Sequence, residues 1–160
     1  MRVTHLACAV LLAACTGPSE APATGTEPDR VVQALYDAIN RRDTEAALAL
    51  YAPDAVFVEL PADTVVQGTS QLRDYYKQQF TIFPHVRVEV RERKIDGGTV
   101  VDELLLRDHP CGGTVTDVIT YQVVDGRIRS ASVEPHGAEE GKAVSIIPGV
   151  HMVCPASPAP

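Results

Sequence analysis

The sequence contains no tryptophan, and its aromatic residues are limited to three phenylalanines and five tyrosines among 160 residues. A folded core must therefore consist mainly of valine, leucine, isoleucine and alanine. Basic residues are also scarce, because 14 lysines and arginines are outnumbered by 21 acidic residues and the net charge is -7. This charge has the wrong sign for a protein that grips phosphate backbones, so we expect no nucleic-acid partner.

Several motifs are missing as well. The chain has no fibrous or solenoid repeat, no serine nucleophile elbow, no phosphate-binding loop and no dinucleotide-binding fingerprint. Nothing in it indicates covalent, phosphoryl-transfer or redox-cofactor chemistry, and we expect neither a cofactor nor a metal. A length of 160 residues excludes two large domains.

The N-terminal segment MRVTHLACAVLLAAC has one arginine before a short apolar run that ends at Cys15. The run is too short for a permanent membrane span and is typical of a signal peptide. Its ending resembles the bacterial lipobox, which predicts cleavage after residues 1–14 and lipidation of Cys15 with a fatty acid such as palmitate. The alternatives are an ordinary signal peptide cleaved near Ala14, or a buried helix.

Residues 15–28 are rich in proline and glycine and hold almost no large apolar residue, as expected of a flexible tether. We therefore expect a membrane-anchored lipoprotein of the bacterial cell envelope.

The mature chain would keep Cys111 and Cys154 as its remaining thiols, because Cys8 leaves with the signal peptide. In an oxidising compartment two such cysteines predict a disulfide. The alternative is a metal site, since His109 and His151 lie close to them in the sequence. That set matches no standard spacing of metal ligands, so the disulfide is favoured.

The first half of the folded part reads as mainly helical. The spacing of Val31, Leu35 and Ile39 predicts an amphipathic helix capped by Thr26, with Asp29 at the capping-box position, and ending near Arg42. Further elements follow in order: a helix over 44–51 capped by Asp43, a strand over 55–59, and a helix over 68–80.

The second half reads as β-structure. Three glycine-containing turns, at 96–98, 111–113 and 125–126, separate runs rich in valine, threonine and isoleucine, which is a hairpin signature. Four consecutive antiparallel strands are predicted near 86–95, 99–108, 114–124 and 127–134. The whole is an α+β domain over 29–137, followed by a C-terminal tail over 138–160.

The chain resembles the NTF2-like superfamily, in particular its SnoaL-like and ketosteroid-isomerase-like branches. The resemblance is carried by VVQALYDAINRRDTEAALALYAPDAVF, then QGTSQLRDYYKQQF and finally ITYQVVDGRI. It implies a cone-shaped barrel, with three N-terminal helices packed on a curved antiparallel sheet around an apolar pocket.

The resemblance also implies positions for a catalytic site. In the isomerase branch a carboxylate acts as general base, and a tyrosine and a protonated aspartate donate hydrogen bonds to the oxyanion. The base position falls on Glu59, but the two donor positions fall on Leu35 and Ile119. With both donors replaced by apolar residues, we expect slow or absent turnover of a ketosteroid.

Asp117 is a second catalytic candidate, because it shares strand parity with Ile119 and Tyr121 and is predicted to face inward. An alternative is that Asp117 lies where the sheet opens to water, and that Glu59 is a solvated strand end. In VVDELLL, either Asp102 or Glu103 must face inward, and the pattern does not decide which.

Ligand-binding residues are predicted at five apolar or aromatic positions: Leu35, Phe57, Tyr76, Ile119 and Tyr121. Tyr75 is a further source of a hydroxyl group, although all these aromatic residues could instead be plain core. His85 could line the pocket as a base, but a neutral loop histidine is favoured, and His136 is equally open.

Three classes of function follow. The first is a lipoprotein domain that binds a small apolar molecule. The second is a cofactor-free isomerase or cyclase that uses Glu59 or Asp117 as general base. The third is an interaction module, in which the outer face of the sheet forms a homodimer or docks a partner.

Overall fold

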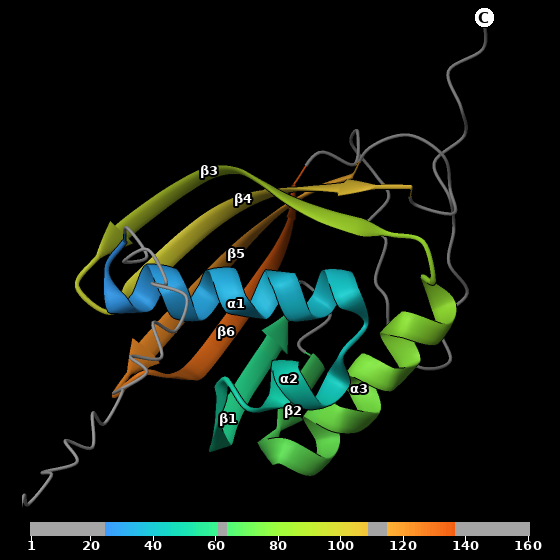
Figure 1. Cartoon of the computed structure of the whole chain (residues 1–160), viewed down its shortest axis with the longest axis horizontal. Coiled ribbons are helices and arrows are strands. Elements are labelled where there is room, and N and C mark those ends of the chain that lie inside the picture. The colour runs from blue at the N-terminus through green and yellow to red at the C-terminus, as the bar shows by residue number, and fades with distance from the viewer. Residues whose placement is uncertain (1–24, 61–63, 109–114, 137–160) are drawn as a thin grey trace, which may run out of the picture.

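The computed structural model describes residues 25–60, 64–108 and 115–136. Residues 135 and 136 are described by their backbone alone. These residues form an α+β domain of three helices and a curved sheet (Figure 1). The helices are α1 (Glu27–Arg41), α2 (Thr44–Leu48) and α3 (Gly68–Ile82). The strands are β1 (Tyr51–Glu59), β2 (Thr64–Gln67), β3 (Arg87–Asp96), β4 (Thr99–Arg107), β5 (Val115–Val124) and β6 (Arg127–His136).

The six strands are ordered β2-β1-β6-β5-β4-β3 in one sheet. All neighbouring pairs are antiparallel except β1 and β6, which run parallel. The sheet curves around α1, which lies across its concave side, while α3 packs against β1 and β2 (Figure 1). The core therefore lies between the helices and the concave face.

The predicted β-meander is confirmed, since the four strands β3 to β6 lie within two residues of the expected bounds. The turn between β5 and β6 explains why its position could be predicted. Asp125 and Gly126 have φ angles of 51° and 69°, which is the conformation that a two-residue hairpin turn requires. Aspartate and glycine tolerate this conformation best, so the signal is local and readable.

The first helix is confirmed, but its capping is not as expected. Thr26 occupies the N-cap position without a side-chain capping bond. Asp29 does not complete a capping box either, because its carboxylate binds Arg93 instead. The helix starts where it does because Pro28 is tolerated in the first turn and Val32 and Leu35 bury one face completely.

The second helix is shorter than predicted. Asp43 caps it as expected, accepting a bond of 2.9 Å from the amide of Ala46. The helix ends at Leu48, however, and Tyr51 already belongs to β1, where it pairs with Ile128 of β6. Pairing with a distant strand overrides the local helical pattern here. The edge strand β2 was not expected from the sequence at all.

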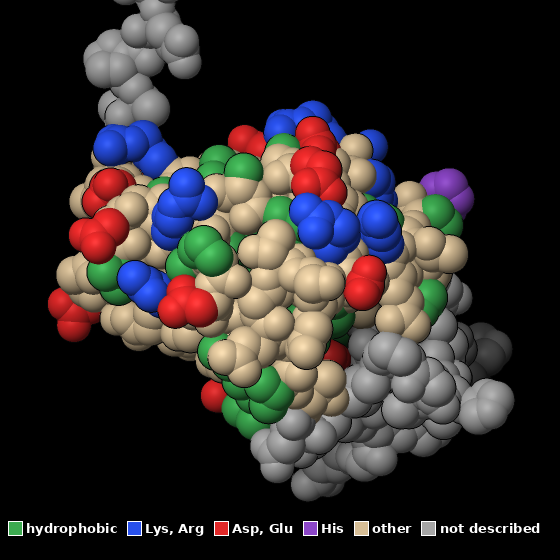
Figure 2. Space-filling model, turned by 90° about the horizontal axis from the view of Figure 1, so that it is seen from below, with side chains coloured by type: hydrophobic (Ala, Val, Ile, Leu, Met, Phe, Trp, Pro, Cys, Tyr) green, Lys and Arg blue, Asp and Glu red, His purple; other side chains and the backbone are tan. Residues whose placement is uncertain are grey.

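The order of the helices agrees with the expectation, because a strand separates the second helix from the third. The third helix extends to Ile82, two residues beyond the expected end, and it follows the unexpected strand β2 directly. No helix in the described part of the chain is long and apolar enough to cross a membrane. On the face shown in Figure 2, acidic and basic side chains are interspersed over the described surface.

Candidate functional site

A cavity of about 140 Å³ lies between α1, α3 and the concave face of the sheet. For comparison, a buried apolar cavity of about 150 Å³ in another protein holds one benzene molecule. The wall is mostly apolar or aromatic. Its residues are Tyr36, Ile39, Arg42, Phe57, Glu59, Tyr75, Tyr76, Gln79, Phe80, Phe83, Val86, Val88, Leu104, Leu106, Asp117, Ile119, Tyr121 and Val133.

Two carboxylates line this cavity from different strands. Glu59 ends β1 and is only 6% exposed, while Asp117 is half-buried on β5. Both strands pair with β6, one on each side of it. In the sheet register Glu59 pairs with Val133 of β6, and Asp117 pairs with Pro135, two residues further along β6. The strand parity that placed Asp117 on the inner face in the sequence analysis agrees with this position. The catalytic role of the two acids stays a prediction.

The protonation of Asp117 is shifted by its surroundings. Burial, and then the nearby charge of Glu59, raise its pKa from 3.8 to about 6. Both effects penalise the ionised form, burial because it removes water and Glu59 because like charges repel. A carboxyl group of this kind can accept or release a proton close to neutral pH, which is what acid–base chemistry requires.

All five tyrosines of the chain gather at the cavity. Tyr36, Tyr75, Tyr76 and Tyr121 line it, and the hydroxyl of Tyr51 lies 2.7 Å from that of Tyr76. Burial is the main cause that raises the pKa of each hydroxyl above its usual value. The tyrosines therefore stay neutral and keep their protons available as hydrogen-bond donors.

Arg42 is the basic residue among the described lining residues. It adopts a left-handed backbone conformation just after α1, with a φ of 61°. Its guanidinium donates to the backbone carbonyls of Ile39, Pro84 and Val86, and lies 5.4 Å from the centre of the Phe80 ring. Burial, followed by repulsion from Arg87, lowers its pKa. Arg42 thus fixes the loop after α3 against the end of α1.

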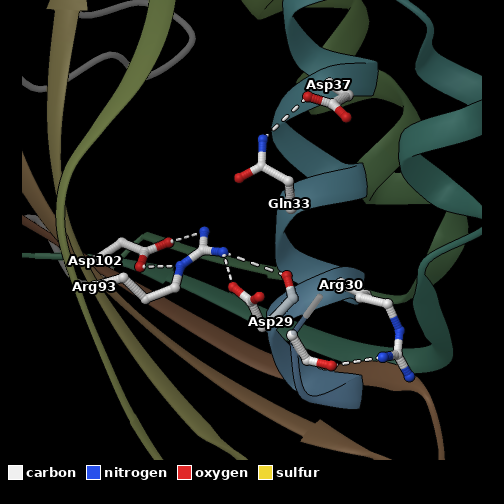
Figure 3. Close-up of polar contacts among 7 residues, drawn as sticks. Asp29, Arg30, Gln33, Asp37, Arg93 and Asp102 are labelled. Carbon is white, nitrogen blue, oxygen red and sulfur yellow. Dashed lines mark hydrogen bonds and ion pairs between the residues drawn. The ribbon is translucent and has the colours of Figure 1, made fainter. Parts of the chain in front are cut away.

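Of the two adjacent acids in β4, Asp102 faces inward and is completely buried, whereas Glu103 lies on the outer face. Asp102 does not line the cavity. Arg93 of β3 binds both of its oxygens at 2.7 Å and also reaches Asp29 of α1 at 2.6 Å (Figure 3). The inward acid is therefore part of a structural ion pair that holds the first turn of α1 to the sheet.

Four of the five predicted ligand-binding residues line the cavity, namely Phe57, Tyr76, Ile119 and Tyr121. The expectation for Leu35 is wrong, because this side chain is fully buried in the core and is absent from the described cavity wall. Neighbouring positions on a helix point about 100° apart. The next residue, Tyr36, faces the cavity instead.

Hydroxyl groups reach the cavity from positions other than the two that the resemblance implied for the oxyanion donors. Tyr36 from α1 and Tyr121 from β5 both line the cavity and meet at a ring distance of 6.1 Å. Tyr36 directly follows Leu35, the position that the resemblance implied for the tyrosine donor. The sequence contains one signal for this position, since Tyr36 lies next to the apolar stripe of α1.

The remaining candidates lie elsewhere. His85 is exposed and does not belong to the described cavity wall, and the side chain of His136 is not described. Cys15, Cys111 and Cys154 lie outside the described residues, as do the alternative metal ligands His109 and His151. Within the described part, no three histidine, cysteine or acidic side chains are grouped as metal ligands would be.

Several lining residues were not singled out from the sequence. Phe80, Phe83 and Val86 surround the end of α3, and their role depends on where the loop returns to the sheet. Ile39 belongs to the apolar stripe that predicts α1, and such a stripe does not separate core residues from cavity wall.

The fold and the cavity define a class of protein: an α+β domain in which a cavity lies between helices and a curved sheet. The model of the SnoaL-like domain family matches residues 32–131, and the chain belongs to this family. A search of curated proteins finds no similar sequence.

Solved structures share the fold. An NTF2-like protein of unknown function from Burkholderia pseudomallei superposes with a TM-score of 0.62 at 17% identity, covering 69% of this chain and 92% of its own. A protein from Catenulispora acidiphila with a ketosteroid isomerase-like fold, solved in complex with trimethylamine, gives 0.58 at 18%, covering 65% and 83%. The protein TerC, co-crystallised with polyporic acid, gives 0.59 at 18%, covering 69% and 92%.

Proposed function

We propose that this protein binds a small, largely apolar molecule in the cavity between α1, α3 and the sheet. The cavity itself carries the proposal, because it is about 140 Å³ in volume and its wall is dominated by aromatic and aliphatic side chains. Sites of this kind bind small ligands through apolar contact and use a few polar groups for orientation. Two proteins of the same fold were crystallised with small organic molecules, which supports the proposal.

The volume also limits the ligand. A cavity comparable to one that holds benzene encloses about one ring. A four-ring steroid would have to extend beyond it, so we expect a smaller ligand than the substrate of a ketosteroid isomerase.

A binding measurement with a matched pair of variants tests the proposal. Ile119→Phe adds bulk inside the cavity, while Val124→Phe adds the same ring on the same strand at a side chain that is 47% exposed. An apolar fluorescent probe should bind the wild type and the Val124 variant and bind Ile119→Phe at least tenfold more weakly. Equal binding to both variants, or binding to none of the three proteins, would contradict the proposal.

A second function is favoured by the acid pair. Glu59 or Asp117 could remove a proton from the carbon next to a carbonyl, while the hydroxyl of Tyr36 or Tyr121 donates to the carbonyl oxygen. Returning the proton to another carbon completes an isomerisation. In a cyclisation the carbanion attacks a second carbonyl of the same molecule, and the alkoxide that forms takes the proton back from the carboxylic acid. Neither reaction needs a cofactor.

Proton exchange tests this second function without knowledge of the natural substrate. Small cyclic ketones in deuterated water should exchange their α-protons faster with the wild type than with Glu59→Gln or Asp117→Asn. The control is Glu103→Gln, which removes the same charge on the outer face of β4. Exchange that is equal in all four proteins would remove the enzymatic alternative.

We further propose that the domain is attached to the membrane through a lipid on Cys15, in the cell envelope. The lipobox-like ending and the proline-rich segment behind it support this. Labelled palmitate should be incorporated by the wild type and not by Cys15→Ser, and equal labelling of both proteins would contradict the anchor. Homodimerisation through the outer face of the sheet stays a prediction, for which sedimentation of the folded domain is the direct measurement.

A further inference from the structure

The charges around the cavity are unevenly distributed. Glu59 and Asp117 present two carboxylates, while Arg42 presents the positive charge among the described lining residues. The guanidinium of Arg42 is directed to three backbone carbonyls and to the Phe80 ring. None of the ion pairs within the described ranges includes Arg42 or Asp117. Among the described lining residues, the carboxylates therefore outnumber the guanidinium, and Asp117 has no ion-pair partner within these residues.

Aromatic rings continue the wall beside the two acids. The rings of Phe57 and Tyr75 lie 4.9 Å apart, those of Tyr75 and Tyr76 lie 5.6 Å apart at 73°, and those of Tyr76 and Phe80 lie 5.8 Å apart. All four of these aromatic residues line the cavity. Ring faces attract cations, most strongly where water is excluded.

A wall that combines carboxylates with aromatic rings favours some classes of ligand over others. An anion would meet two carboxylates, and a neutral molecule would add no partner for the charge of Asp117. An inorganic cation such as Ca²⁺ requires six or more oxygen ligands, and the described residues offer no grouping of that kind. An organic ammonium ion combines a positive charge with an apolar surface, and it satisfies both halves of this wall.

We infer that the cavity binds a small organic cation, a tertiary or quaternary ammonium group of about the size of one ring. The ammonium charge lies near the carboxylates of Glu59 and Asp117, and its alkyl groups contact the rings of Tyr75, Tyr76 and Phe57. This inference rests on the proposed ligand-binding function and adds the charge of the ligand to it.

The inference has a pH dependence that follows from the groups around Asp117. These groups are Glu59 on β1, Tyr75 on α3, Tyr121 on the same strand and Arg42 at the end of α1. The tyrosines stay neutral and Arg42 stays positive across the range between pH 5 and 8. With the pKa of Asp117 raised to about 6, its charge is lost in this range as the pH falls. Affinity for the cation should fall with it.

Three isosteric probes separate charge from shape: choline, its neutral carbon analogue 3,3-dimethylbutan-1-ol, and the anion 3,3-dimethylbutanoate. Calorimetric titration of the folded protein at pH 7.5 should give an affinity for choline about tenfold higher than for the alcohol, with the anion weakest. At pH 5 the preference for choline over the alcohol should shrink several-fold.

Variants then locate the effect. Asp117→Asn should lose most of the preference for choline and keep its affinity for the alcohol, which also shows that the variant is folded. Glu59→Gln should behave in the same way, and Glu103→Gln, with the same change of net charge, should behave like the wild type.

Two results would overturn the inference. If the alcohol binds as tightly as choline, the site is apolar and not cationic, and the proposed function stands. If none of the three probes binds while the apolar fluorescent probe does, the cation is again excluded and the binding function survives. Failure of the fluorescent probe itself contradicts the proposed function separately.

Discussion

Arg93 lies opposite Asp102 because β3 contains one extra residue between Val90 and Glu92. In an uninterrupted ladder Glu92 would face Asp102, and two acids would meet in the core. The bulge shifts the alternation of side chains by one position and brings a guanidinium to a carboxylate that is fully buried. The hydrogen bonds to Asp102 and Asp29 more than offset the lowering of the Arg93 pKa by burial, so that pKa is raised.

Loss of this ion pair should be strongly destabilising. Arg93→Ala leaves the buried carboxylate of Asp102 without its bidentate partner, and we expect the free energy of unfolding to fall by about 3 to 5 kcal/mol. The control is Arg91→Ala, since Arg91 pairs with Glu103 on the exposed outer face and its loss should cost less than about 1 kcal/mol. Urea denaturation of both variants measures the difference, and similar costs would contradict the special role of Arg93.

The pair can also be replaced instead of broken. The double variant Arg93→Met, Asp102→Leu removes both charges, so it should be markedly more stable than Arg93→Ala alone. A double variant that unfolds as easily as Arg93→Ala would show that lost packing, and not the unpaired charge of Asp102, causes the loss of stability.

Asp117 should make stability depend on pH in an unusual direction for an aspartate. Its folded-state pKa of about 6 lies above the ordinary value of 3.8, so the folded state binds the proton more tightly than the unfolded state does. This contribution is fully present below pH 4 and is lost as the pH rises toward 6. The shift corresponds to roughly 3 kcal/mol.

Asp117→Asn should therefore be more stable than the wild type at pH 7 by up to about 3 kcal/mol, with the difference shrinking toward pH 4. Denaturation curves of the two proteins at four or five pH values across this range measure it. A difference that does not change with pH would show that Asp117 is not responsible.

The hydrogen bond between Tyr51 and Tyr76 predicts unequal effects of two similar variants. Tyr76→Phe leaves the hydroxyl of the deeply buried Tyr51 without its partner, and we expect a cost of about 1 to 3 kcal/mol. Tyr51→Phe leaves the hydroxyl of Tyr76 beside the cavity, where water can reach it, so the cost should be smaller. Equal costs would argue against water at that position. Thermal unfolding of the two variants in parallel checks the order.

The caps of the two first helices give a further matched pair. Asp43→Ala removes the side-chain bond to the amide of Ala46 and should cost about 1 kcal/mol. Thr26→Ala should change stability by less than about 0.5 kcal/mol, because Thr26 makes no capping bond with its side chain. Chemical denaturation distinguishes the two, and a large effect of Thr26→Ala would be inconsistent with the structure.

The features that could be predicted from the sequence are those with local causes. The turn at Asp125 and Gly126 requires residues that accept positive φ, and the inner position of Asp117 follows from the two-residue period of a strand. The distinction between Leu35 and Tyr36 could not be predicted, because it depends on how α1 is rotated against the sheet. The bulge in β3 likewise has no local sequence signal, so the partner of Asp102 could not be named.

The parallel pairing of β1 with β6 has a consequence for how the protein is made. Tyr51 and Ile128 are neighbours in the sheet although 77 positions separate them in the sequence, while the hairpins from β3 to β6 involve short separations. Contacts between distant segments form late, because a long loop must close first. The walls of the cavity come from both halves of the chain. On a ribosome, the cavity can therefore close only after the last strand has emerged, because a chain that ends before β6 lacks both Val133 in the cavity wall and the strand that joins β1 to β5.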